Sequence, residues 1–150
     1  MRRRTVLATA LLATAAMGTV PSHAAPTKKP ITGSYSVTLM PDPSNDVTNA
    51  AGKDGCTGAS PQGRNSHPFT VPGAGTLKVV LDSPDPTGKG VTDWDLYVLD
   101  SDGTIVDKGD GATSHEETLD KLKKKTSLTF VVCNGAGSPN ATITYTFTPA

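Results

Sequence analysis

The sequence lacks most of the residue patterns on which catalysis and metal binding depend. It holds two cysteines and three histidines in 150 residues, and none of them stands at a Cys-x-x-Cys or His-x-x-x-His spacing. A zinc site made from Cys56, Cys133, His67 and His115 is therefore not indicated. Gly-x-Ser-x-Gly is absent, and no histidine stands in a recognisable triad setting, so nucleophilic catalysis is not favoured.

Other shortages exclude further classes of protein. Basic and acidic residues are equal in number at 14 each, whereas a nucleic-acid-binding domain normally carries a basic excess. The one basic cluster, Lys121 with residues 123–125, is interpreted as a solvated turn rather than a contact for phosphate or an anionic polymer. Aromatic residues make up 5% of the chain, and this scarcity argues against an exposed aromatic platform that stacks on sugars.

The N-terminus has the features of a secretory signal peptide. Arginines at 2–4 precede an uncharged stretch over 5–20, and small residues flank a cleavage position after Ala24. The uncharged stretch is shorter than the roughly 20 residues of a spanning helix. We therefore predict a signal peptide over 1–24, a secreted chain with no membrane span, and export by either the general or the twin-arginine route.

Two cysteines remain in the exported chain, and an even pair indicates one disulfide, Cys56–Cys133. This bond closes a loop of about 80 residues, which the chain-entropy model values at roughly 4 kcal/mol. Residues 25–32 are expected to be a flexible lead-in, and 33–150 a single domain. The segment 41–66 is rich in proline, glycine and asparagine, and we predict that the disulfide tethers it as a long loop.

An alternation of apolar and polar residues dominates the rest of the chain, as expected of strands with one face toward a core. We predict about eight strands, at 33–40, 67–71, 75–82, 93–100, 103–108, 114–119, 126–133 and 140–148. Turn-forming residues separate most of them. The pattern predicts an all-β, antiparallel sandwich or jelly-roll-like fold. Only 114–125 is ambiguous, and we favour a strand and a basic turn over a helical turn.

The stretch VTDWDLYVLDSDG over 91–103 carries the only tryptophan. Trp94, Leu96 and Val98 share one face of the predicted strand and are expected in the core with Leu77, Val79 and Leu81. The DSDG segment resembles the start of an EF-hand loop, but Gly111 stands where the bidentate glutamate belongs. A hairpin turn with Gly103 at positive φ is the better interpretation.

Several aspartates could instead bind calcium. Asp82, Asp85, Asp93 and Asp95 bracket one loop, and their carboxylates would converge if strands 75–82 and 93–100 paired. Such a cluster, together with loop carbonyls, is a candidate calcium site, and a solvated acidic loop is the alternative. Asp93 and Asp95 are also spaced like paired catalytic carboxylates, but no cleft-forming insertion surrounds them.

Four segments together resemble the bacterial pre-peptidase C-terminal domain: GTLKVVLDS, DWDLYVLDSDGTIVDKG, EETL and LTFVVCNGAGSPNATITYTF. The resemblance covers roughly 67–148, and the stretch Asp93 to Tyr97 is its most specific part. It implies a small β-sandwich with a non-catalytic binding or auxiliary role, in a family with calcium-using relatives. The chain departs from the pattern because it stands alone, without a peptidase domain, and because it carries the disulfide and the long loop.

These observations favour one function over two others. The first is a secreted, non-catalytic binding module for an extracellular protein or a cell-envelope polymer such as a polysaccharide, with calcium as a candidate cofactor. The second is a structural protein of the cell surface without a small ligand. The third, a small hydrolase, would require a pocket with convergent polar groups.

Overall fold

The computed structural model describes residues 28–42, 56 and 62–150. The predicted signal peptide, residues 25–27 of the lead-in and most of the segment 41–66 lie outside these residues. The last two residues of the predicted lead-in, 31 and 32, belong to the first strand. The described chain forms eight strands: β1 (Ile31–Thr38), β2 (Arg64–Val71), β3 (Gly75–Asp82), β4 (Asp93–Leu99), β5 (Ile105–Gly109), β6 (His115–Leu122), β7 (Thr126–Ala136) and β8 (Asn140–Pro149).

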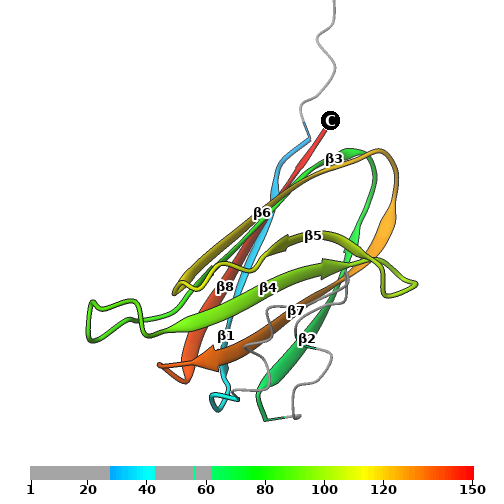
Figure 1. Ribbon diagram of the computed structural model, residues 1–150. Coiled ribbons are helices and arrows are strands. Elements are labelled where there is room, and N and C mark those ends of the chain that lie inside the picture. The colour runs from blue at the N-terminus through cyan, green and yellow to red at the C-terminus, as the bar shows by residue number, and fades with distance from the viewer. Residues whose placement is uncertain (1–27, 43–55, 57–61) are drawn as a thin grey trace, which may run out of the picture.

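The strands form two four-stranded antiparallel sheets, which lie face to face (Figure 1). One sheet has the order β1-β8-β3-β6 and the other the order β2-β7-β4-β5. This interleaving of strands that are distant in the chain is the jelly-roll arrangement. The predicted fold class is therefore confirmed.

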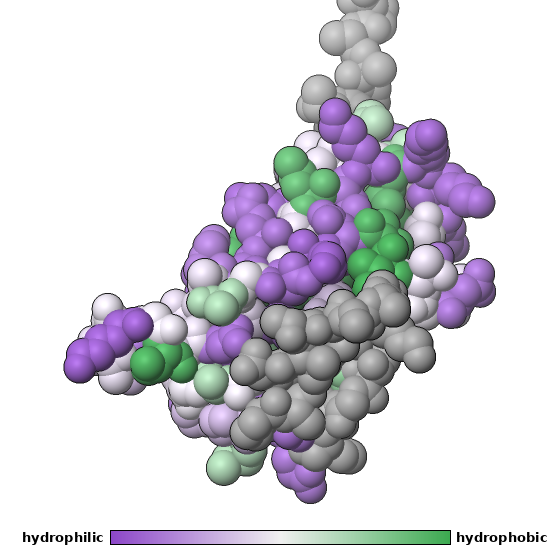
Figure 2. All heavy atoms as spheres, in the orientation of Figure 1, coloured by the Kyte–Doolittle hydropathy of each residue, from purple (hydrophilic) through white to green (hydrophobic). Residues whose placement is uncertain are grey.

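The core lies between the sheets and is made by the predicted alternation. Trp94, Leu96 and Val98 of β4 are fully buried, as are Leu77 and Val79 of β3. The indole N–H of Trp94 donates a hydrogen bond to the carbonyl of Ser138 at 3.1 Å, which satisfies the one polar group of a large buried ring. The outside of the molecule is correspondingly polar, with apolar residues scattered among hydrophilic ones on the face in Figure 2.

The ambiguous segment 114–125 is a strand followed by an exposed turn, and not a helix. Its residues reverse the usual pattern, because Glu116, Thr118 and Asp120 face inward and are buried, whereas Leu119 is exposed. β6 is an edge strand of its sheet, and its inner face lies against β5 of the other sheet. A carboxylate of β5 stabilises this contact, since Asp107 Oδ2 accepts the backbone N–H of Leu119 at 2.9 Å.

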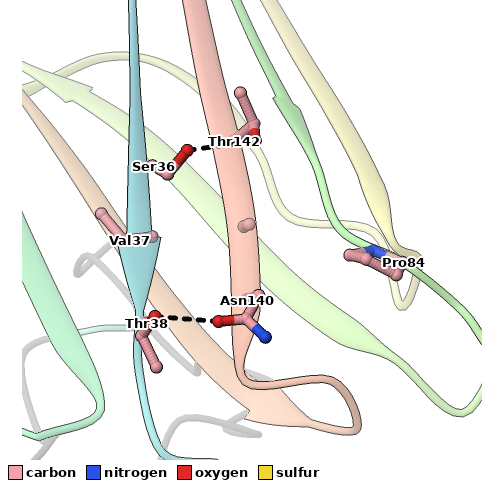
Figure 3. Close-up of a pocket in the computed structure, with 7 residues that line it drawn as sticks. Ser36, Val37, Thr38, Pro84, Asn140 and Thr142 are labelled. Carbon is pink, nitrogen blue, oxygen red and sulfur yellow. Dashed lines mark hydrogen bonds between the residues drawn. The ribbon is translucent and has the colours of Figure 1, made fainter.

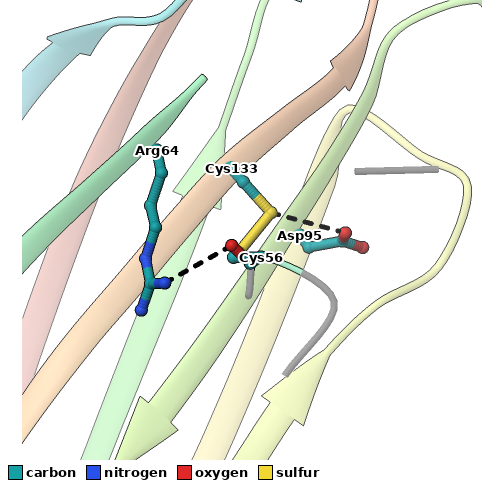
Figure 4. The surroundings of a disulfide bond; sticks show 4 residues. All are labelled: Cys56, Arg64, Asp95 and Cys133. Atoms are coloured by element: carbon teal, nitrogen blue, oxygen red, sulfur yellow. Dashed lines mark hydrogen bonds between the residues drawn. A yellow bond between two sulfur atoms is a disulfide. The ribbon is translucent and has the colours of Figure 1, made fainter. Parts of the chain in front are cut away.

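A second, smaller apolar cluster lies on the outer face of the β4–β7 pair. Tyr97 and Leu99 are buried there together with Val131, Cys133 and Cys56. The predicted disulfide is present, with the two Cα atoms 5.8 Å apart, and Figure 4 shows it between β7 and the described residue of the long loop. The disulfide thus holds Cys56 over the outer face of β7, as the sequence predicted.

Aromatic rings close the side of the sandwich where β1 and β2 are the edge strands. The ring of Tyr35 stacks on His67 with centroids 4.3 Å apart, and Phe69 contacts both Phe130 and Tyr145. The burial of Tyr35 raises the pKa of its hydroxyl. His67 is therefore part of a packed aromatic cluster.

Candidate functional site

The four aspartates of the predicted calcium site would converge only through a strand pairing that does not occur. β3 pairs with β6 and β8, whereas β4 pairs with β5 and β7 in the opposite sheet. The condition under which the four carboxylates would converge, pairing of strands 75–82 and 93–100, is therefore not met. The physical reason is that the segment between them crosses from one sheet to the other, so the two strand ends belong to different layers.

Asp82 and Asp85 each have partners close by. Asp82 Oδ1 lies 2.6 Å from Nδ1 of His115 on the neighbouring strand β6, and both side chains are exposed. Asp85 accepts hydrogen bonds from the backbone N–H of Gly90 at 2.8 Å and from the hydroxyl of Thr87 at 2.9 Å. These bonds lower the pKa of Asp85. Asp85 thus orders its own loop.

Asp93 and Asp95 face the outer side of β4 but have different surroundings. Asp95 Oδ2 lies 3.7 Å from the sulfur of Cys133, beside the disulfide (Figure 4). Its negative charge, after the stronger effect of the Asp110 carboxylate, helps to raise the pKa of Lys108. Asp93 is near Glu116, whose pKa is raised mainly by burial and further by the charges of Asp110 and Asp93.

Among the residues that the structure describes, no three acidic, histidine or cysteine side chains form a group that could hold a metal ion. Calcium binding by Asp82, Asp85, Asp93 and Asp95 stays a prediction from the sequence. The four side chains form no metal-binding group of three in the described ranges.

The outer face of β1 and β8 carries a regular array of hydroxyl side chains, here called the hydroxyl face. The register pairs Thr32 with Thr146, Ser34 with Thr144, Ser36 with Thr142 and Thr38 with Asn140. All eight side chains are exposed or half-buried. They point outward because their neighbours along each strand fill the core, and successive side chains alternate between the two faces.

One end of this face is hollowed. A hollow of about 290 Å³ is lined by the β1 and β8 side of the sheet and by the loop after β3: Ser36, Val37, Thr38, Pro84, Asn140, Ala141 and Thr142. Thr38 donates a hydrogen bond to Oδ1 of Asn140 at 2.8 Å, and the hydroxyls of Ser36 and Thr142 lie 3.5 Å apart. Figure 3 shows Pro84 on the far side of β8 from these β1 residues.

The hydroxyl donors and acceptors of the hollow are uncharged, but the contact between the Asp82 carboxylate and the His115 imidazole lies beside them. The register places Ser36, Thr142, Asp82 and His115 in one row across four neighbouring strands. In a catalytic triad the imidazole stands between the hydroxyl and the carboxylate, so that it can take the hydroxyl proton. Here the carboxylate stands between the hydroxyl and the imidazole, so the row does not have the order of a triad.

The hollow was not predicted from the sequence, although the Ser/Thr pattern of its lining residues can be recognised there. The alternating threonines of 140–148 indicate a strand with a polar outer face, and nothing in them reveals which strand lies alongside. Pairing of β1 with β8 joins residues that are about a hundred positions apart. The signal that could have found the site is the coincidence of two Ser/Thr-rich strands, one near each end of the domain.

The fold and the hollow together define an eight-stranded jelly-roll domain with a disulfide and a hydroxyl-lined surface. No protein-family model matches the chain, and no curated protein matches it. Among solved structures it is similar to the mitogen from Yersinia pseudotuberculosis, at 16% identity and a TM-score of 0.33. That match covers 58% of this chain and 86% of the mitogen.

No helix in the described ranges is long and apolar enough to span a membrane. The disulfide is typical of proteins that fold in an oxidising compartment outside the cytosol.

Proposed function

We propose that this protein is a secreted, non-catalytic module that binds a neutral, hydroxyl-rich polymer of the cell envelope in the hollow at the end of the hydroxyl face. The observation that carries the proposal is the lining of the hollow by Ser36, Thr38, Asn140 and Thr142. These side chains offer hydroxyl and amide groups, each of which can donate and accept hydrogen bonds.

The chemistry of this lining suits a sugar better than a charged ligand. A sugar hydroxyl is also both donor and acceptor, and it carries no charge that a lysine or carboxylate would have to balance. The hollow is open at the surface of an extended strand pair, so a long chain can pass along it. Pro84 supplies an apolar wall, against which the C–H face of a sugar ring can pack.

Secretion is part of the same proposal. The basic, uncharged and small-residue segments of 1–24 are those of an export signal, and the disulfide accords with an oxidising compartment. The resemblance to the pre-peptidase C-terminal domain accords with an auxiliary role rather than catalysis. Binding to such a polymer keeps the secreted protein at the cell envelope.

The test is binding to a purified, neutral cell-wall polysaccharide by co-sedimentation or calorimetry. We expect the double variant Ser36→Ala/Thr142→Ala to bind about tenfold or more weakly, because each lost hydrogen bond contributes roughly 1 kcal/mol. The matched control is Thr32→Ala/Thr146→Ala, which removes a facing pair on the same two strands outside the hollow.

The control variant should bind like the wild type. Equal binding by all three proteins would place any polymer contact away from the hollow. The absence of binding by the wild type to neutral polysaccharides, with retention on an extracellular protein, would replace the polymer by a protein ligand.

A further inference from the structure

Strand β1 is an edge strand of its sheet, with one neighbouring strand in the part of the chain that the structure describes. It pairs with β8 along its whole length and with no other strand in the described part of the chain. The register with β8 is continuous from Ile31 to Thr38, without a bulge. Such an edge presents a row of N–H and C=O groups to any strand that can lie beside it.

The other three edges each have a feature that hinders strand addition. β2 contains Pro68, which has no N–H to donate. β5 has only five residues, and its pairing with β4 shifts register between Val98 and Leu99. The backbone N–H of Leu119 on β6 is already bound by the carboxylate of Asp107, and β6 is rich in charged residues.

β1 has none of these features among the described residues. No charged residue occurs between Lys29 and Asp42, and no proline lies within the strand. Its outward side chains are the small hydroxyl residues of the hydroxyl face, so no bulky or charged group hinders an approaching strand. An uncharged edge of eight residues is compatible with a second uncharged edge of the same kind.

Two exposed apolar side chains flank this edge, one at each end. Ile31 begins the strand and is 40% exposed, and Met40 follows the strand and is 63% exposed. An antiparallel approach of two β1 strands brings the Ile31 end of one copy to the Met40 end of the other. The exposed apolar side chains then stand at both ends of the joined strands, close to the second copy.

We infer that two copies of this protein pair antiparallel through their β1 edges and form a dimer with one continuous eight-stranded sheet. The contact is isologous, because the same edge serves both copies around a two-fold axis. The two hydroxyl faces then lie side by side on the same surface. If the proposed polymer binding holds, one dimer presents two hollows to one chain and gains avidity, but the dimer does not depend on that function.

The experiment is sedimentation velocity over a wide range of concentrations, with a matched pair of variants. Ser34→Lys introduces a charge at the middle of β1, and its control Thr144→Lys introduces the same charge on β8, at the residue that faces Ser34 in the register. Both positions are exposed, so both variants should fold, which circular dichroism checks.

We expect the wild type to show a concentration-dependent dimer of micromolar affinity, because a single strand pair buries less than a standard interface. Ser34→Lys should raise the dimer dissociation constant about tenfold or more, since it brings two lysines close to the axis. Thr144→Lys should leave it near the wild-type value. A wild type that stays monomeric at the highest concentration, or a dimer equally weakened by both variants or by neither, would overturn the β1 pairing.

Discussion

Asp120 shows how a single residue can oppose the fold that contains it. Its side chain faces inward from β6 and is 8% exposed, and its Oδ2 atom has no hydrogen-bond partner among the described residues. Burial, and then the charge of Asp107, raises its pKa from 3.8 to about 6. Inward charges at a sheet edge are one way to discourage edge-to-edge association, and here they lie where β5 meets β6.

This pKa gives a pH dependence with a definite sign. The unfolded chain releases the Asp120 proton near pH 4 and the folded chain near pH 6, so the free energy of unfolding falls as pH rises between these values. The full difference applies above pH 6, where the carboxyl is charged in both states. We expect Asp120→Asn to gain stability relative to the wild type over this window, measured by urea unfolding with Trp94 fluorescence.

The control for this experiment is Asp102→Asn, at an exposed position in a turn. Because Asp102 is exposed, its substitution should change the free energy of unfolding by less than about 0.5 kcal/mol. Parallel curves for wild type and Asp120→Asn between pH 4 and pH 7 would show that the Asp120 carboxyl does not oppose folding.

Alanine substitutions at three glycines distinguish the cost of backbone strain from the cost of steric crowding. Gly137 has φ +87° and an added Cβ would lie 2.6 Å from the Cα of Thr92, so Gly137→Ala should lower the free energy of unfolding by roughly 2–4 kcal/mol. Gly103 has φ +79° but open space around it, and Gly103→Ala should cost about 1 kcal/mol. Gly73→Ala, in open space, should be near neutral. Chemical denaturation ranks the three, and an equal effect at Gly137 and Gly103 would contradict the contact with Thr92.

At the scale of the strands, the disulfide links β7 to the segment that precedes β2, the strand with which β7 pairs. Cys133 lies in β7, and its partner Cys56 precedes β2, the strand that pairs with β7. Arg64 of β2 also donates to the carbonyl of Cys56 at 3.4 Å. The two cysteines are 77 residues apart in sequence. Their bond thus reinforces contacts that the sheet already makes.

Removal of the disulfide should therefore lower stability without changing the fold. We expect Cys56→Ala/Cys133→Ala to reduce the free energy of unfolding by about 2–5 kcal/mol, because the unfolded chain regains the freedom that the closed loop removes. Dithiothreitol should bring the wild type toward the variant and leave the variant unchanged. A variant as stable as the oxidised wild type would mean that the sheet alone holds this region.

The strands themselves were largely predictable. Strand 75–82 has the predicted bounds, and β4 differs from its prediction by one residue. β2 begins at Arg64, three residues before the predicted 67, because its pairing with β7 continues to Cys133. β6 was harder, since its buried face is polar and a local pattern of hydrophobicity cannot indicate a face that is not hydrophobic.

At the scale of the whole molecule, the partition of strands between sheets decides which side chains can share a ligand. It separates Asp82 from Asp93 and Asp95, and it brings β1 beside β8. The same partition leaves the β1 edge at one side of the sandwich. The topology thus keeps the aspartates of the candidate calcium site apart, and it brings together the side chains of the candidate polymer site.

A calcium titration tests the metal prediction on the intact protein. A constant thermal midpoint at millimolar calcium would contradict calcium binding by Asp82, Asp85, Asp93 and Asp95, which form no metal-binding group of three in the described ranges. An ion that binds only the native state must raise the midpoint. A rise that Asp93→Asn/Asp95→Asn abolishes would restore the calcium site that the sequence suggested.

The sequence by itself determined which segments are strands, which face of most of them is apolar, and that its two cysteines bond. These properties depend on residues close together in the chain, where a period of two is visible directly. Only the tertiary structure decided that β1 lies beside β8, that β3 and β4 belong to different sheets, and where the hollow opens. Those outcomes depend on pairing between residues far apart in sequence, and the alternation within each strand is the same whichever neighbour it has.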